Sequence, residues 1–115
     1  TASTKGTLVR IFSIENGEKV AEFRRGFTPA EIVGLSANTD YVCACSRTTI
    51  HVFSYDGKHM TLTPDVSPLC CMFRDGELFV AFEDGIVSSY VIDGESVVLF
   101  RQQPLSSVVV SAKDP

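Results

Sequence analysis

The sequence has no tryptophan and no apolar run that approaches the roughly 20 residues needed to cross a bilayer. Residues 1–5, Thr-Ala-Ser-Thr-Lys, do not resemble a signal peptide. No stretch shows a convincing helical pattern of apolar residues. These absences exclude an integral membrane protein built from helices, and we expect a wholly soluble or peripheral protein.

Arrangements typical of enzymes are also missing. No Ser-His-Asp or Cys-His set occurs with supporting motifs, and acidic residues such as Glu31, Asp56 and Glu83 fall mostly in turn-forming segments. We therefore expect a protein that is not an enzyme and has no cofactor.

Positive charge is scarce, with 10 Lys and Arg residues against 14 Asp and Glu, a net charge of -4 and a pI near 5.0. This balance opposes indiscriminate binding to nucleic acid or to an anionic membrane, so nucleic acid is not an expected partner. Recognition of an anion would need a local basic cluster, for which the candidates are Lys5, Arg10, Arg24, Arg25 and Arg47.

The four cysteines occur as Cys43-x-Cys45 and Cys70-Cys71. Zinc knuckles and thioredoxin-type pairs both have two residues between their cysteines, so neither is indicated and no metal site is expected. Reduced cysteine is small and apolar and suits a buried strand, where Cys43 and Cys45 would share one face. A reducing, cytosolic compartment is the simpler inference.

The 115 residues are enough for a single small domain, and 44% hydrophobic residues with 21% charged residues is a globular composition. Runs rich in β-branched residues, often alternating, predict an all-β fold, and they are separated by turn signals such as Asp56-Gly57 and Asp75-Gly76. The predicted strands are residues 7–14, 19–25, 31–37, 41–46, 49–55, 69–73, 77–82, 86–92 and 96–101.

Three of these strands close on an aromatic residue, at Phe12, Phe53 and Tyr90, spaced 41 and 37 residues apart. The spacing is close to the roughly 40 to 45 residues of a WD-repeat propeller blade, although the Trp-Asp signature is absent. A ring needs about four to eight blades, and the chain holds two full blades and part of a third at most. We expect a fragment, cut before residue 1, whose first partner is the remainder of the propeller chain.

Arg24 and Arg25, in the run Phe23-Arg24-Arg25-Gly26, are the main candidates for anion binding. Neighbouring side chains on a strand point to opposite faces, so one arginine pair could serve two pockets. The guanidinium group grips phosphate with a planar fork of donors. The alternative is a solvated strand end with two arginines that merely reach into water.

Four runs together, residues 3–12, 17–19, 23–26 and 49–53, resemble the PROPPIN family of seven-bladed propellers that bind phosphoinositides. The resemblance covers nearly the whole chain and implies about blades 5 to 7 of such a propeller. Residues 1–26 would end blade 5, residues 27–66 would form blade 6, residues 67–105 would form blade 7, and residues 106–115 would be a tail or closing strand.

The resemblance further implies two shallow rim pockets, each for the head group of phosphatidylinositol 3-phosphate or phosphatidylinositol 3,5-bisphosphate. The first would contain Arg24 with Ser3, Thr7 and Arg10. The second would contain Arg25 with Ser46, Thr48, Thr49 and His51. Hydroxyl groups and an imidazole are suitable companions, because each can donate a hydrogen bond to a phosphate oxygen.

Some features depart from the family pattern. The turn Arg47-Thr48-Thr49 lacks the glycine that the family often has there, and Glu31 would repel phosphate if it lay near the site. The family's long membrane loop would be reduced to about residues 56–65, with Met60 and Leu62 as its only sizeable apolar side chains. Any insertion would then be shallow, and His59 would lie in this loop.

The implied role is a cytoplasmic protein held peripherally on autophagic or endosomal membranes, to which it delivers autophagy proteins. The alternative is a WD-repeat-type scaffold that binds an acidic protein partner through the same arginines and binds no lipid.

Overall fold

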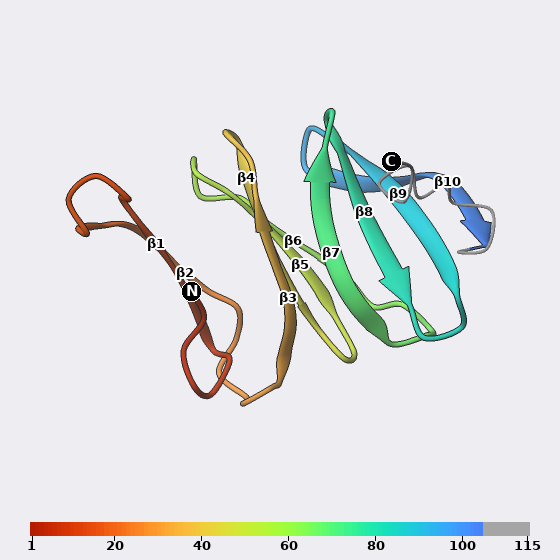
Figure 1. Cartoon of the computed structure of the whole chain (residues 1–115), viewed down its shortest axis with the longest axis horizontal. Coiled ribbons are helices and arrows are strands. Elements are labelled where there is room, and N and C mark those ends of the chain that lie inside the picture. Colours follow the sequence, from red (N-terminus) through yellow and green to blue (C-terminus); the bar gives the residue numbers. More distant parts are fainter. Residues whose placement is uncertain (105–115) are drawn as a thin grey trace, which may run out of the picture.

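The computed structural model describes residues 1–104, and this part of the chain contains strands and turns but no helix. The strands are β1 (Leu8–Phe12), β2 (Lys19–Arg24), β3 (Ile32–Ala37), β4 (Tyr41–Ser46), β5 (Ile50–Ser54), β6 (His59–Leu62), β7 (Pro68–Arg74), β8 (Glu77–Phe82), β9 (Ile86–Asp93) and β10 (Ser96–Pro104). They form three antiparallel sheets in the orders β1-β2, β3-β4-β5-β6 and β7-β8-β9-β10 (Figure 1).

The all-β prediction is confirmed, and each of the nine predicted strands corresponds to an observed one. The prediction missed β6, which was expected to be a loop. Its sequence, His59-Met60-Thr61-Leu62, is short, but it alternates between side chains that face outward and side chains that face the core. This alternation directly follows the Asp56-Gly57 turn, so the signal for a strand was present.

The middle sheet packs on both of its faces. On β4, Val42 and Ala44 join the cluster shared with Val9 of β1 and Phe53 of β5. The alternate residues Cys43 and Cys45 point to the other cluster, whose buried members from the third sheet are Leu78, Val80, Phe82 and Tyr90. Because successive side chains of a strand face opposite sides, β4 contributes to both cores.

The strands β3 and β7 are the first strands of their sheets and lie against each other (Figure 1). The contact is close at Gly34 of β3, where an added Cβ would lie 3.0 Å from the backbone nitrogen of Cys71. A side chain at this position would push the two sheets apart. At the far end of β7, Asp75 and Gly76 both have positive φ, as a two-residue type I′ hairpin turn requires.

The two four-stranded sheets span residues 32–62 and 68–104, one within each of the ranges predicted for blades 6 and 7. The division into numbered blades itself remains a prediction. The tail or closing strand predicted for residues 106–115 lies outside the described residues. Within residues 1–104 there is no helix long and apolar enough to cross a bilayer.

Candidate functional site

The two arginines lie at the end of β2, where the first sheet meets the second. Arg24 is the last residue of β2 and pairs with Leu8 of β1. Arg25 follows the strand, and its backbone N–H donates to the carbonyl of Thr7 over 2.9 Å. The predicted strand, residues 19–25, therefore extends one residue beyond β2. Because Arg25 lies outside the strand, the alternation of side chains along β2 does not determine the direction in which Arg25 points.

The guanidinium groups nevertheless make separate contacts. Arg24 lies over the ring of Phe27, 4.7 Å from its centroid, and donates to the carbonyl of Gly26 over 3.4 Å. Arg25 donates to the carbonyls of Gly6 and Thr28. Within residues 1–104 neither arginine forms an ion pair with a carboxylate. In this part of the chain no carboxylate therefore balances either charge.

Arg24 also lines a cavity of about 460 Å³ between β2 and the β5–β6 hairpin. We call it the Arg24 cavity. The aromatic residues Phe23, Phe53 and Tyr55 form part of its wall, and Glu22, Lys58 and His59 add polar groups. Sequence reasoning missed Lys58 and His59, because both were assigned to a loop. The turn signal Asp56-Gly57 could have placed them at the start of a strand beside β5.

The companions predicted for Arg24 have other partners. The Ser3 hydroxyl accepts a hydrogen bond from the N–H of Leu8 over 3.1 Å, which holds the segment before β1 against that strand. The Arg10 guanidinium is paired with Glu22 at 3.1 Å, and hydrogen bonds from Lys19 and Arg10 lower the pKa of Glu22. Ser3, Thr7 and Arg10 do not line the Arg24 cavity. The structure therefore does not join them to Arg24 in one pocket.

Four of the five residues predicted for the second pocket come together, namely Ser46, Thr48, Thr49 and His51, whereas Arg25 forms its hydrogen bonds with Gly6 and Thr28. The Ser46 hydroxyl lies 2.9 Å from the Thr49 hydroxyl and 3.5 Å from the Thr48 hydroxyl, and it accepts the N–H groups of both threonines. The Thr49 hydroxyl lies 3.0 Å from Nε2 of His51. The turn between β4 and β5 thus folds around Ser46, which explains how it forms without a glycine.

His51 continues this network to β6. Its Nδ1 lies 2.8 Å from Nε2 of His59, so one ring donates and the other accepts. Burial, and then the charges of His59 and Arg25, lower the pKa of His51 to about 4, and burial lowers the pKa of His59. The lowered pKa values favour the neutral form of both rings at pH 7, and Arg25 is the cationic side chain whose charge acts on His51.

Stacked aromatic rings hold the end of β2, and with it the two arginines, beside the hydrogen-bond network of His51 and His59. Phe23 of β2 stacks on Phe53 of β5 with ring centroids 5.1 Å apart, and Phe53 stacks on His59 at 4.4 Å. The stack crosses from the first sheet to the second. Because Phe23 directly precedes Arg24, it holds the end of β2 against the β5–β6 hairpin.

Arg47, another candidate for the basic cluster, is already paired. Its guanidinium lies 2.6 Å from Glu31 and 3.6 Å from Glu83, and the Glu31 hydrogen bond raises the pKa of Arg47. Glu31 was expected to repel phosphate if it lay near the site. It instead pairs with Arg47, which compensates its charge.

The predicted membrane loop is corrected by the structure. The connection between β5 and β6 is only residues 55–58, and Met60 and Leu62 lie on β6. Met60 is 7% exposed within the core, and Leu62 packs against the same core. Because both side chains face the interior, they are not available to enter a bilayer.

Comparisons of the sequence with known proteins agree on one family. The profile of the PROPPIN family matches residues 1–97. Autophagy-related protein 18 of Neosartorya fischeri is 43% identical over 81 residues, which is 68% of this chain and 18% of that protein. Autophagy-related protein 18 of Komagataella pastoris is 52% identical over 56 residues, covering 46% of this chain and 10% of that protein. The chain thus spans less than a fifth of the length of these relatives.

Solved structures show the same fold. Kluyveromyces lactis Hsv2 superposes with a TM-score of 0.70 at 21% identity, over 90% of this chain and 42% of that one. A form of it with loop 6CD replaced by a Gly-Ser linker gives a TM-score of 0.72 at 24% identity, over 90% of this chain and 40% of that one. The WD40 repeats of RRP9 give 0.65 at 18% identity, over 85% of this chain and 32% of that one. The three sheets therefore have the arrangement of part of a β-propeller.

Proposed function

This chain belongs to the PROPPIN family, and on that premise we propose that it forms part of a phosphoinositide-binding surface in which Arg24 and Arg25 each hold one head group. The role is binding rather than catalysis. The head groups are those of phosphatidylinositol 3-phosphate and phosphatidylinositol 3,5-bisphosphate, and the protein acts peripherally on autophagic or endosomal membranes. The names of the relatives favour autophagy proteins as its partners.

The observation that carries the proposal is the absence of a carboxylate partner at two adjacent guanidinium groups. In the described part of the chain, Arg10, Lys19, Arg47, Arg74 and Arg101 all form ion pairs, whereas Arg24 and Arg25 do not. In a protein of net charge -4, this leaves a local concentration of uncompensated positive charge. Lys58, at the Arg24 cavity, also forms no ion pair within residues 1–104, although its charge helps to lower the pKa of the nearby Asp56 carboxyl.

The second pocket is supported by a ready set of donors. Ser46, Thr49 and His51 already share hydrogen bonds, and hydroxyl groups can turn their protons toward a phosphate oxygen. Arg25 stands near enough to His51 to lower the pKa of that ring. A phosphate group between them would accept hydrogen bonds from both sides.

Two weak sites on one surface explain membrane attachment better than one. A charge-assisted hydrogen bond contributes about 1.5–3 kcal/mol, and desolvation and immobilisation offset much of the sum for a single lipid. When both pockets face the same bilayer, the second binding step is effectively intramolecular and raises avidity by roughly 10²–10⁴. Removing either arginine should then weaken attachment far more than one lost contact would suggest.

The proposal is tested by liposome sedimentation with the whole protein that carries this chain. The double variant Arg24→Thr, Arg25→Thr should lose binding to vesicles that contain phosphatidylinositol 3-phosphate and remain folded, with a melting temperature lowered only by the lost contacts of the two side chains. Arg74→Thr is the matched control, because Arg74 is an exposed arginine paired with Asp75 at the β7–β8 turn. It should bind as the unchanged protein does. Undiminished binding by the double variant would refute the proposal, and failure of the unchanged protein to bind these vesicles would favour a scaffold for an acidic protein.

A further inference from the structure

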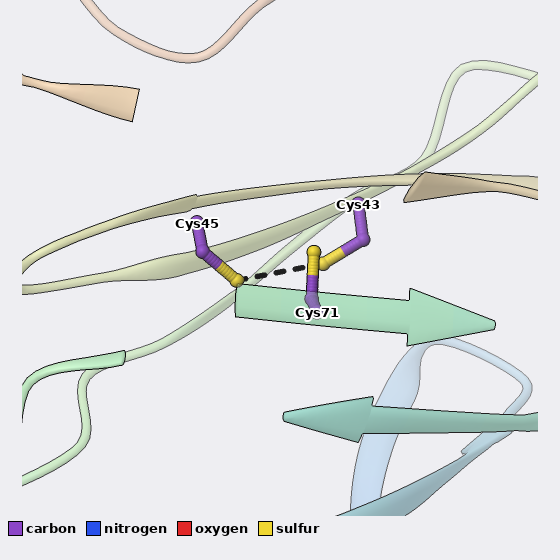
Figure 2. Close-up of side chains that lie close together, drawn as sticks. All are labelled: Cys43, Cys45 and Cys71. Atoms are coloured by element: carbon purple, nitrogen blue, oxygen red, sulfur yellow. Dashed lines mark hydrogen bonds between the residues drawn. The ribbon is translucent and has the colours of Figure 1, made fainter. Parts of the chain in front are cut away.

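Three thiol groups converge between the second and third sheets. The sulfur atoms of Cys43, Cys45 and Cys71 all lie within 4.8 Å of one another, and those of Cys43 and Cys45 are 3.9 Å apart. Figure 2 shows Cys43 and Cys45 reaching from β4 toward Cys71 on β7. We call these residues the thiol triad. The spacing of cysteines in the sequence could not reveal it, because Cys71 comes from another sheet.

The backbone around the triad is shaped for this approach. Gly34 faces Cys71, and a Cβ at that position would lie 3.2 Å from the Cys71 sulfur. The strand pairing is irregular on both sides of the contact, between Ile32 and Gly34 and between Pro68 and Cys70. Such bulges re-aim side chains. Here they accompany the Cys71 thiol turning inward while the neighbouring Cys70 is exposed.

The surroundings of the triad are apolar. Cys43 and Cys45 are fully buried in a cluster with residues such as Val52, Leu78 and Tyr90. No histidine or carboxylate of residues 1–104 belongs to the group. Cys71 is only partly buried and is the most accessible of the three residues.

A metal ion can be held by all three sulfur atoms only after their thiols lose their protons. The thiolate is the form of cysteine that ligates metals.

We propose that the thiol triad is a binding site for a soft monovalent metal ion, Cu(I), held by three sulfur atoms. A metal–sulfur bond of about 2.3 Å in a flat three-coordinate arrangement requires sulfur atoms about 4 Å apart. The 3.9 Å between Cys43 and Cys45 meets this requirement, and Cys71 lies within a short movement of it.

The set of ligands selects Cu(I) over Zn²⁺. Structural zinc sites almost always have four ligands in a tetrahedron, and the described residues supply three. Thiolates are soft ligands that suit Cu(I) well. Each thiol that ligates gives up its proton, so binding should weaken as pH falls. The bound ion would join β4 to β7 and so tie the second sheet to the third.

The test uses the whole protein, reduced and stripped of metal under nitrogen, and Cu(I) supplied in competition with a coloured Cu(I) chelator. We expect one Cu(I) per chain and a higher melting temperature with the ion than without it. Cys71→Ser should lower the affinity by at least about 100-fold, more than the loss of an outer-shell group costs. Cys70→Ser is the matched control, because it removes an adjacent but exposed thiol, and its affinity should stay within about twofold, as expected where no ligand is lost.

Several results would overturn the proposal. One is that the folded, reduced protein does not bind Cu(I). Another is that Cys71→Ser and Cys70→Ser lose equal amounts of Cu(I) affinity. A third is that the protein retains Zn²⁺ more tightly than Cu(I). A disulfide between Cys71 and Cys43 or Cys45 whose reduction restores no Cu(I) binding would also overturn it. X-ray absorption on the unsubstituted protein gives a check that no variant can compromise, since the copper should show a single shell of three sulfur atoms.

Discussion

Replacement of Gly34 by alanine should destabilise the protein, because the packing of β3 on β7 leaves no room for a side chain. The added methyl group would lie 3.0 Å from the Cys71 backbone nitrogen, 3.2 Å from the Cys70 Cα and 3.2 Å from the Cys71 sulfur. Two of these three atoms are backbone, so relief requires β7 to move. Overpacking of this kind costs about 1–3 kcal/mol.

The same substitution also has a smaller, stabilising effect, which acts on the unfolded chain. Gly34 does not have positive φ, so alanine can adopt its conformation and would gain about 0.4–1 kcal/mol by restricting the unfolded chain. The expected net loss in the free energy of unfolding is therefore about 1.3 kcal/mol from the middle of the two ranges, and at most about 2.6 kcal/mol.

The assay is urea denaturation of the whole protein, with Gly26→Ala as the matched control. A Cβ at Gly26 would meet nothing within 4 Å, and its φ is not positive. This control should leave the free energy of unfolding unchanged or raise it by up to about 1 kcal/mol. The reasoning would be refuted if Gly34→Ala were as stable as Gly26→Ala, since the two sheets would then not be in close contact at β3 and β7.

Three further predictions follow from the same structure. Met60→Ala should lower the free energy of unfolding by about 2–5 kcal/mol because Met60 is buried, whereas Thr63→Ala, at an exposed residue directly after β6, should change it by less than about 0.5 kcal/mol; equal effects in urea denaturation would contradict the placement of β6 in the core. The pKa of His51 is lowered from 6.5 to about 4, so between these pH values the unfolded chain binds a proton that the folded chain does not, and stability should fall by about 1–2 kcal/mol as pH drops through this window. His51→Gln should remove that part of the pH dependence, and an unchanged pH profile of unfolding would show that His51 titrates normally. Arg25→Thr alone should weaken binding to phosphoinositide vesicles by roughly 10²-fold or more through lost avidity, and unaltered sedimentation would mean that the second pocket binds no lipid.

Most of the fold could be predicted because its signals are local. Alternation of apolar and polar residues defines strands such as β8, and turn pairs such as Asp75-Gly76 separate them. The exception, β6, has only four residues and begins with a histidine. The expectation of a loop there also misassigned Met60, whose burial depends on pairing with Val52 of β5.

The candidate site was predictable only where its residues are close in sequence. Ser46, Thr49 and His51 come together because one tight turn joins β4 to β5. The Arg24 cavity and the thiol triad depend on contacts between sheets, as at Phe23 with Phe53 and at Gly34 with Cys71. Such contacts are set by how whole sheets pack, which no local pattern of residues specifies.

The most direct test of the central claim is the number of head groups that the whole protein binds in solution, without a membrane. Calorimetric titration with the soluble head group inositol 1,3-bisphosphate should give two sites, and Arg24→Thr and Arg25→Thr should each remove a different one. One site in the unchanged protein, or the loss of the same site in both variants, would contradict the assignment of one arginine to each head group.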